Sequence, residues 1–135
     1  RIRGNVSLYP GVQIFGQNGE IIINNGTKIN GQTQIISLNR IEIGENCYIA
    51  QQVVIRDNDG HKISLDGKEP EMKCIPVKIG NHCWIGQKAM ILKGVELGDN
   101  VIVAAGAIVT SNAEAGSLVG GVPAKKIREN VRWEA

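Results

Sequence analysis

A polar segment near the middle of the chain holds the residues best suited to chemistry. Residues 57–61 read Asp-Asn-Asp-Gly-His, and His61 is one of only two histidines in the 135-residue chain. An imidazole titrates near neutral pH, so a positioned histidine can take a proton from an attacking group. An ordinary solvated loop histidine fits the same residues equally well. Asp57, Asn58 and Asp59 could orient the imidazole or bind a substrate, but Asp and Asn beside glycine favour a simple turn.

The remaining histidine and the cysteines carry weaker signals. His82 lies two residues before Trp84, and we expect it to be an exposed turn residue. The odd number of cysteines, Cys47, Cys74 and Cys83, shows no paired spacing, which indicates plain thiols in a reducing compartment. None of them is predicted to act as a covalent nucleophile.

The residues around this segment follow a six-residue period. Small or branched side chains, Cys47 and Cys83 among them, stand four places after most of the residues that lead each unit. From Ile55 to Ile79 the sequence advances 24 residues, a multiple of six, so the polar segment leaves the phase unchanged. We therefore expect a loop at about residues 57–76, extruded from an intact scaffold. The uninterrupted leaders are Ile79, Ile85, Ile91, Leu97, Val103 and Val109.

This period predicts an all-β solenoid in a single domain spanning residues 1–135. A six-residue unit is too short for a helix and too regular for hairpins, so each unit is a short strand and a turn. Three units would form a triangular coil of about 18 residues, and coils stacked about 4.8 Å apart would bury an aliphatic column. A two-residue slip between Ile41 and Ile43 makes the N-terminal third less regular.

The C-terminal end departs from the repeat. Helix formers follow Pro123, and Ile127 and Val131 are four residues apart. We expect a short C-terminal helix from about Ala124 to Trp133, within a cap of about residues 123–135 that closes the solenoid.

Composition excludes several classes of protein. A formal net charge of +2 is too small to indicate a nucleic-acid partner, and no apolar run is long enough for membrane insertion. With 17 glycines and 4% aromatic residues, the interior must be built from small and branched aliphatic side chains. Nothing resembles a signal peptide, although Arg1 in place of methionine indicates a trimmed start. We expect a cytoplasmic protein.

Two sequence runs resemble a known family. These are IGNHCWIGQKAMILKGVELGDNVIVAAGAIVT and, after it, GGVPAKKIR. They are similar to the hexapeptide-repeat acyltransferases, and within them to sugar O-acetyltransferases such as the galactoside, maltose and polysaccharide-modifying enzymes. The resemblance covers roughly residues 41 to 130. It implies a left-handed parallel β-helix, a homotrimer, and acetyl-CoA bound in a cleft between neighbouring subunits. It also implies that the interrupting loop carries the catalytic histidine, which is His61 here.

The resemblance also implies a set of cofactor-binding residues. We expect the large side chain of Trp84 to project outward from the column rather than into it. It corresponds to a tryptophan beside the acetyl end of the cofactor, although a surface or subunit-packing role fits it too. Lys125 and Arg128 match basic positions that contact CoA phosphates, where charge-assisted hydrogen bonds are strong, and the other cations are read as a solvated face. Ser111 stands where many relatives have lysine. The remaining matched positions are Gly86, Gln87, Ala104, Ala105 and Thr110, and the alanines also suit a tight coil.

The predicted activity is transfer of acetyl from acetyl-CoA to a hydroxyl of a saccharide or nucleotide-sugar acceptor. In this hypothesis His61 removes the hydroxyl proton, and the oxygen attacks the thioester directly in a ternary complex. Two alternatives stay open: N-acylation of an amino sugar, and a non-catalytic β-helix scaffold. A zinc enzyme of the γ-carbonic-anhydrase type needs three histidine ligands, and this chain has two histidines, so no metal is expected.

Overall fold

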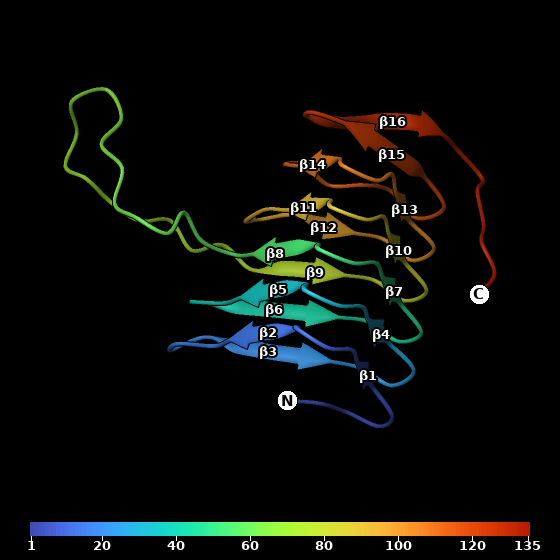
Figure 1. Ribbon diagram of the computed structural model, residues 1–135. Helices are drawn as coiled ribbons and strands as arrows, with labels where there is room; N and C mark the ends of the chain where they lie inside the picture. Colours follow the sequence, from blue (N-terminus) through green and yellow to red (C-terminus); the bar gives the residue numbers. More distant parts are fainter.

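The computed structural model describes residues 1–135 as a stack of parallel β coils (Figure 1). The chain visits three sheets in turn, here named A, B and C. Sheet A holds β3 (Glu20–Ile23), β6 (Arg40–Ile43), β9 (Val77–Ile79) and β12 (Glu96–Leu97). Sheet B holds β1 (Ser7–Leu8), β4 (Lys28–Ile29), β7 (Tyr48–Ile49), β10 (Trp84–Ile85), β13 (Ile102–Val103), β15 (Leu118–Gly121) and β16 (Ala124–Arg128). Sheet C holds β2 (Gln13–Phe15), β5 (Gln34–Ile36), β8 (Val54–Arg56), β11 (Met90–Ile91) and β14 (Ile108–Val109).

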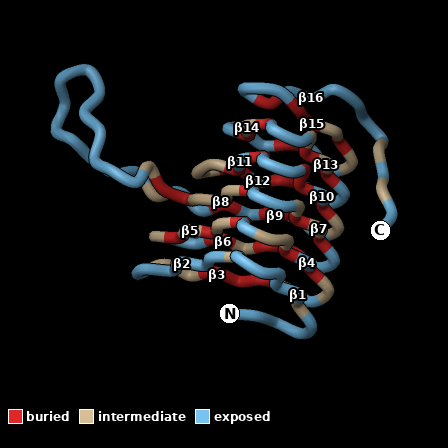
Figure 2. Tube along the Cα trace, viewed as in Figure 1, coloured by how far each residue is buried: buried red, intermediate tan, exposed pale blue.

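The leading aliphatic residue of each unit points inward and stacks on its counterpart in the next coil. In sheet B, Ile49, Ile85 and Val103 are paired in register, and all three are buried. Buried residues consequently form continuous lines inside the coils, from the N-terminal end to the C-terminal end (Figure 2). The predicted aliphatic column and the predicted all-β class are confirmed.

The irregular N-terminal third consists of longer coils. Ile23 pairs with Ile43, an advance of 20 residues, whereas Lys78 pairs with Glu96, an advance of 18. The two extra residues lie in sheet A, where β6 turns both Ile41 and Ile43 inward. The slip seen in the sequence is therefore a longer strand inside an unbroken stack.

Tight turns at three corners join the sheets. The BC corner links sheet B to sheet C, the CA corner links sheet C to sheet A, and the AB corner returns the chain to sheet B. A residue with positive φ occupies most of these turns, as at Asn46 (54°) and Asn100 (58°) in the AB corner. Asn and Gly tolerate this left-handed conformation best, which explains why turn residues recur at a fixed phase.

The two cysteines in the small slot pack inside adjacent coils. Cys47 and Cys83 are buried, and their thiols donate to the carbonyls of Gly80 and Gly98, each at 3.1 Å. Hydrogen bonding with Cys47, together with burial, raises the pKa of the Cys83 thiol. The predicted packing role of this pair is confirmed, and Cys74 is half-buried in the loop.

The predicted C-terminal helix is wrong. Residues Ala124–Arg128 form β16, which pairs antiparallel with β15 through a turn that joins Gly121 to Ala124. β15 is the last strand stacked in sheet B, and a strand across its edge satisfies backbone groups that a helix would leave unpaired. The final residues then run back down beside the coils (Figure 1), where the Val131 amide donates to the Gly116 carbonyl at 2.9 Å. The chain has no helix that could cross a membrane.

Replacing a central leader should destabilise the whole stack. Ile85 is fully buried between paired coils, so Ile85→Ala should lower the free energy of unfolding by about 2–5 kcal/mol. Urea unfolding at fixed protein concentration measures this change. Ile127→Ala is the matched control, because Ile127 is 48% exposed and its truncation should cost less than about 1 kcal/mol. Equal losses in the two variants would contradict the stacked-column account.

Candidate active site

Five of the predicted cofactor residues line one apolar groove on the outer face of sheet B. The groove has a volume of about 570 Å³ and runs across β7, β10 and β13. Trp84 projects outward from β10, as expected, between Tyr48 and Ile102 of the adjoining coils. The predicted residues that share the groove are Trp84, Gly86, Gln87, Ala104 and Ala105.

Gly86 sets the spacing at the BC corner beside Trp84. A Cβ atom on Gly86 would lie 2.6 Å from the Ala105 amide nitrogen and 2.7 Å from the Val103 carbonyl oxygen. No side chain fits at such distances, so glycine is required for the next coil to approach this closely. Ala104 and Ala105 follow on that coil, and their small side chains keep the end of the groove open.

The C-terminal tail brings a second tryptophan close to two aromatic residues of this groove. The Trp133 ring lies 6.1 Å from the Trp84 ring and 6.3 Å from that of Tyr48, measured between centroids. It stacks on His82 at 4.2 Å with an interplanar angle of 4°, and its indole nitrogen donates to the His82 carbonyl at 2.9 Å. His82 does lie in a turn, as predicted, but it is half-buried because the indole covers it. The sequence suggested no site role for Trp133, because it was assigned to a helix.

The interrupting loop, residues 57–76, leaves the CA corner between β8 and β9 and extends well away from the coils (Figure 1). Single antiparallel bridges, Asn58 with Cys74 and Ile63 with Glu71, tie its two arms together. His61 lies on the outgoing arm and is exposed. The loop and the groove thus occupy different corners of the prism, with sheet C between them.

Asp57 anchors the root of the loop to the coil below. Its carboxylate is buried and accepts hydrogen bonds from the Ser37 hydroxyl at 2.7 Å and from the Leu38 and Asn39 amides at 2.9 and 3.0 Å. The Asn58 side chain donates a fourth bond at 3.0 Å. Burial alone would raise the pKa of Asp57, but these four hydrogen bonds outweigh it and hold the pKa below its ordinary value.

Asp59 anchors the same root to the coil above. Its carboxylate lies 2.5 Å from the Lys93 ammonium group and accepts a hydrogen bond from the Lys73 amide at 3.2 Å. The bond to Lys93 lowers the pKa of Asp59. The polar groups of Asp57 and Asp59 are thus used within the protein, which supports the turn interpretation. Substrate binding by these residues stays a prediction.

Arg56 is a site residue that the sequence reasoning missed. It stands on the outward side of β8, directly before the loop, and its guanidinium donates to the Asn58 side-chain oxygen at 3.2 Å. Its Nε atom is buried and has no hydrogen-bond partner. Gly60 directly precedes His61, and a Cβ atom on it would lie 2.8 Å from an Arg56 nitrogen. The absence of a side chain at Gly60 therefore leaves room for the Arg56 guanidinium. The sequence signal that could have identified Arg56 is that it follows Phe15 and Ile36 in an otherwise apolar outward row of sheet C.

The other predicted cofactor residues lie outside the groove. Thr110 follows β14 at the CA corner, the same corner from which the loop departs. Lys125 and Arg128 are exposed on β16, at the C-terminal end of sheet B. Lys126 between them is paired with Glu129 at 3.0 Å and Glu114 at 3.3 Å, whereas Lys125 has no ion pair.

Comparison with known proteins supports the resemblance. A family model described as the hexapeptide repeat of succinyl-transferase matches residues 76–111. Galactoside O-acetyltransferase of Escherichia coli K12 is 34% identical over 116 residues, which are 85% of this chain and 57% of the relative. This chain therefore spans little more than half the length of that relative.

Solved structures agree over nearly the whole chain. A galactoside acetyltransferase in complex with coenzyme A superposes with a TM-score of 0.85 at 34% identity, covering 96% of this chain and 65% of the other. A polysialic acid O-acetyltransferase superposes with a TM-score of 0.79 at 31% identity, covering 100% of this chain and 70% of the other. The fold is a left-handed parallel β-helix, and the chain belongs to the hexapeptide-repeat acyltransferases.

The buried Asp57 carboxylate should make stability depend on pH. Because its pKa is lowered in the folded state, its contribution is present above the unfolded pKa of about 3.9 and is lost as the pH falls through the folded value. Asp57→Asn should lower the free energy of unfolding by about 1–3 kcal/mol at pH 7, and the difference from the unmodified protein should shrink below pH 4.

Urea unfolding between pH 3 and 7 measures this effect. Asp66→Asn is the matched control, because Asp66 is exposed in the same loop and should change stability by less than about 0.5 kcal/mol. A deficit in Asp57→Asn that is the same at every pH would show that the charge of Asp57 is not what the hydrogen bonds stabilise.

Proposed function

We propose that this chain is an acetyl-CoA-dependent O-acetyltransferase that acts on a saccharide hydroxyl, with His61 as general base. The observation that carries the proposal is the apolar groove beside Trp84, in a family member whose 34% identical relative binds coenzyme A. The relatives named for galactoside and polysialic acid acetylation support a sugar acceptor.

The groove suits the pantetheine arm of acetyl-CoA. Its walls are apolar, and at Ala104 and Ala105 the side chains are small enough for the amides of the arm to approach the backbone. Trp84 covers the acetyl end, and Gln87 stands at the mouth. Lys125 and Arg128 lie further along the same sheet, where they can meet the phosphates by charge-assisted hydrogen bonds.

One chain alone leaves the site incomplete. His61 belongs to the CA corner and the groove to sheet B and the BC corner, so the base must approach the groove from a neighbouring copy. In a ring of three chains, the loop of each chain would reach the groove of the next. Thr110, on the same corner as the loop, would approach the cofactor from that neighbour as well.

The outward faces of the sheets indicate which side meets the partner. Sheet A carries charged residues outward: Glu20, Arg40, Glu42, Lys78 and Glu96. Sheet C carries mostly apolar ones, and its polar exceptions are Gln13, Gln34 and Arg56. The apolar ones are Phe15, Ile36, Val54, Met90 and Ile108. An apolar face of this extent marks an interaction surface. We therefore place sheet C against the axis of a homotrimer.

The reaction is a direct transfer. The imidazole of His61 takes the proton of the saccharide hydroxyl as the hydroxyl oxygen bonds to the thioester carbonyl carbon. The carbon–sulfur bond then breaks, and the departing CoA thiolate takes the proton from the imidazolium. Arg56, under Gly60, restricts the arm that presents the imidazole. No protein nucleophile is needed, in keeping with the burial of Cys47 and Cys83.

Removing the imidazole should abolish transfer but spare cofactor binding. In His61→Ala, saccharide-dependent loss of thioester absorbance from acetyl-CoA should fall by at least 10²–10⁴-fold, the range of a general base. Affinity for CoA, measured by calorimetry, should change less than about threefold, which is under 1 kcal/mol. Lys62→Ala, the neighbouring exposed loop residue, should retain activity. Full activity in His61→Ala would exclude the proposed base.

Mixed trimers should restore activity that each variant lacks. Ala105→Trp fills the groove and His61→Ala removes the base, so either homotrimer should be inactive. In a trimer that contains both chains, one loop with His61 faces one open groove, and about one third of the normal activity should return. Two affinity tags isolate the mixed trimers. If they are inactive, each site is contained within one chain; if the protein is a monomer by light scattering, the composite site is wrong.

A further inference from the structure

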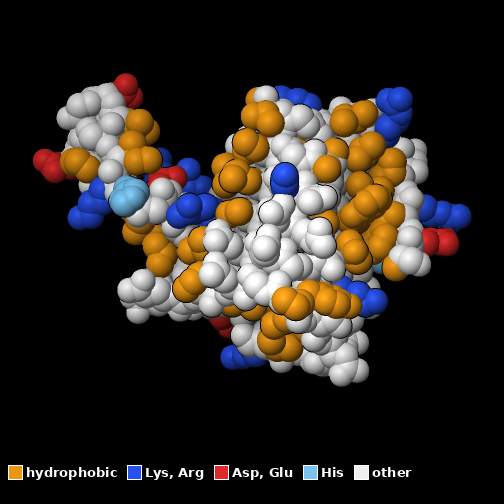
Figure 3. Space-filling model, in the orientation of Figure 1, with side chains coloured by type: hydrophobic (Ala, Val, Ile, Leu, Met, Phe, Trp, Pro, Cys, Tyr) orange, Lys and Arg blue, Asp and Glu red, His pale blue; other side chains and the backbone are white.

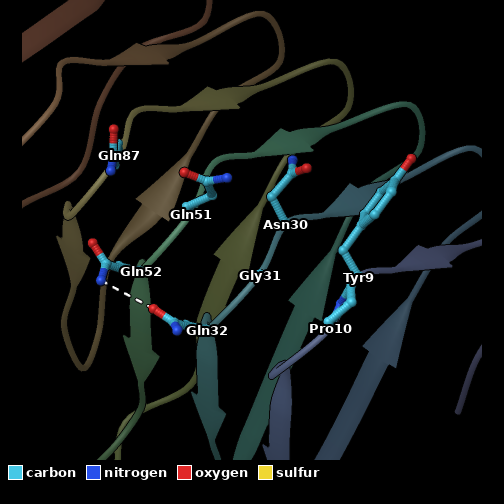
Figure 4. A pocket seen from close by; sticks show the side chains of 8 residues that line it. All are labelled: Tyr9, Pro10, Asn30, Gly31, Gln32, Gln51, Gln52 and Gln87. Atoms are coloured by element: carbon cyan, nitrogen blue, oxygen red, sulfur yellow. Dashed lines mark hydrogen bonds between the residues drawn. The ribbon is translucent and has the colours of Figure 1, made fainter.

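A second groove, polar in character, runs along the BC corner below the apolar one. It has a volume of about 510 Å³ and contains a single hydrophobic residue among the eight that line it. Figure 4 shows that its side chains come from successive coils. They are Tyr9, Pro10, Asn30, Gly31, Gln32, Gln51, Gln52 and Gln87. Gln87 also lines the apolar groove, so the two grooves adjoin at this residue.

The lining has a large unused capacity for hydrogen bonds. Asn30 donates to the Ile49 carbonyl at 2.8 Å, and Gln52 donates to Gln32 at 3.1 Å (Figure 4). These bonds leave the oxygens of Asn30 and Gln52 and the amino group of Gln32 free. The side chains of Gln51, Gln87 and Tyr9 have no partner within the protein. The groove therefore offers donors and acceptors together, and no ionic group is among its lining residues.

The backbone at this corner is unusual for the residues it carries. Gln32 (61°), Gln52 (58°) and Lys88 (62°) have positive φ at the second position of the turn, where the first and last coils have Gly11 and Gly106. Every other non-glycine residue with positive φ is Asn, Asp or His, the types that tolerate this conformation. A long side chain there costs roughly 1–2 kcal/mol. Folding stability alone favours glycine or asparagine at these positions. The presence of Gln32 and Gln52, which line the groove, therefore points to a binding role for their side chains.

The groove is long enough for more than one sugar ring. Tyr9, Asn30, Gln51 and Gln87 belong to four successive coils. Three coil spacings of about 4.8 Å make a groove roughly 14 Å long, which is longer than a single pyranose. Figure 3 shows a band of backbone and of side chains that are neither hydrophobic nor charged, between two hydrophobic areas, with one basic side chain within the band.

We propose that this BC-corner groove binds a neutral oligosaccharide of at least two sugar units, lying along the axis of the coils. Sugar hydroxyls both donate and accept, which matches free amides and a phenol, and the Tyr9 ring can pack against a sugar face. An acidic glycan would need cations, and the lining has none. The inference rests on the proposed function: the chain end nearest Gln87 would present its hydroxyl to the acetyl group in the adjoining groove.

Calorimetry without acetyl-CoA tests the groove directly. The probes are maltotetraose, cellotetraose, chitotetraose and β-1,4-galactotetraose, each against its monosaccharide, and α-2,8-linked tetrasialic acid. At least one neutral tetrasaccharide should bind at least tenfold more tightly than its monosaccharide and than the acidic probe. Gln51→Ala/Gln52→Ala should weaken that binding about tenfold or more, because each lost hydrogen bond is worth roughly 1 kcal/mol.

The controls separate this inference from the proposed function. Gln17→Ala, an exposed glutamine at the CA corner outside the groove, should change affinity less than twofold. Gln51→Glu keeps the size of the side chain and should also weaken binding. It therefore tests the role of the Gln51 amide even if the double variant fails to fold. CoA affinity is measured in parallel on every protein.

Several outcomes would overturn the groove. These are the absence of binding by all neutral tetrasaccharides, equal binding of monosaccharides, tighter binding of tetrasialic acid, and an equal effect of Gln17→Ala. If any of these occurs while CoA binds and a sugar is acetylated, the groove assignment fails and the proposed function stands. If CoA does not bind, the proposed function itself fails.

Discussion

Every coil in this protein buries its aliphatic leaders only because another coil lies directly above or below it. A two- or three-residue strand has too little surface to form a core alone, so the interior is the column made by stacking. Parallel hydrogen bonds fix the register, and the leader positions such as Ile49 and Ile85 hold buried aliphatic side chains. Chemistry is thereby restricted to outward positions, to corners, and to insertions at corners.

The placement of the proposed functional residues follows from this restriction. Trp84 occupies an outward position, Ala105 and Gln87 occupy a corner, and His61 occupies an insertion at another corner. A rigid prism cannot bring two of its corners together. The proposed site draws on both corners, so it would be completed by a second copy. The mostly apolar outer face of sheet C would give a physical reason for that copy to bind.

The loop can project far from the coils because its root is well anchored. Asp57 holds the coil below through three hydrogen bonds, and Asp59 holds the coil above through Lys93. Since the phase of the repeat is the same on both sides, the insertion leaves the column intact. In the proposed trimer, the position of the exposed imidazole would depend on this root and on the neighbouring chain that receives the loop.

The sequence by itself determined the repeat, the aliphatic core, the loop bounded by residues 57 and 76, and the outward projection of Trp84. All of these depend on side-chain period, which is local information. The tertiary structure decided the rest, because it depends on which coils become neighbours. Residues Ala124–Arg128 favour a helix by composition but form a strand, because the edge of β15 is free to pair with them. The stacked BC corners align side-chain amides that are far apart in the sequence. Trp133 reached Trp84 and His82 only because the tail folds back along the coils.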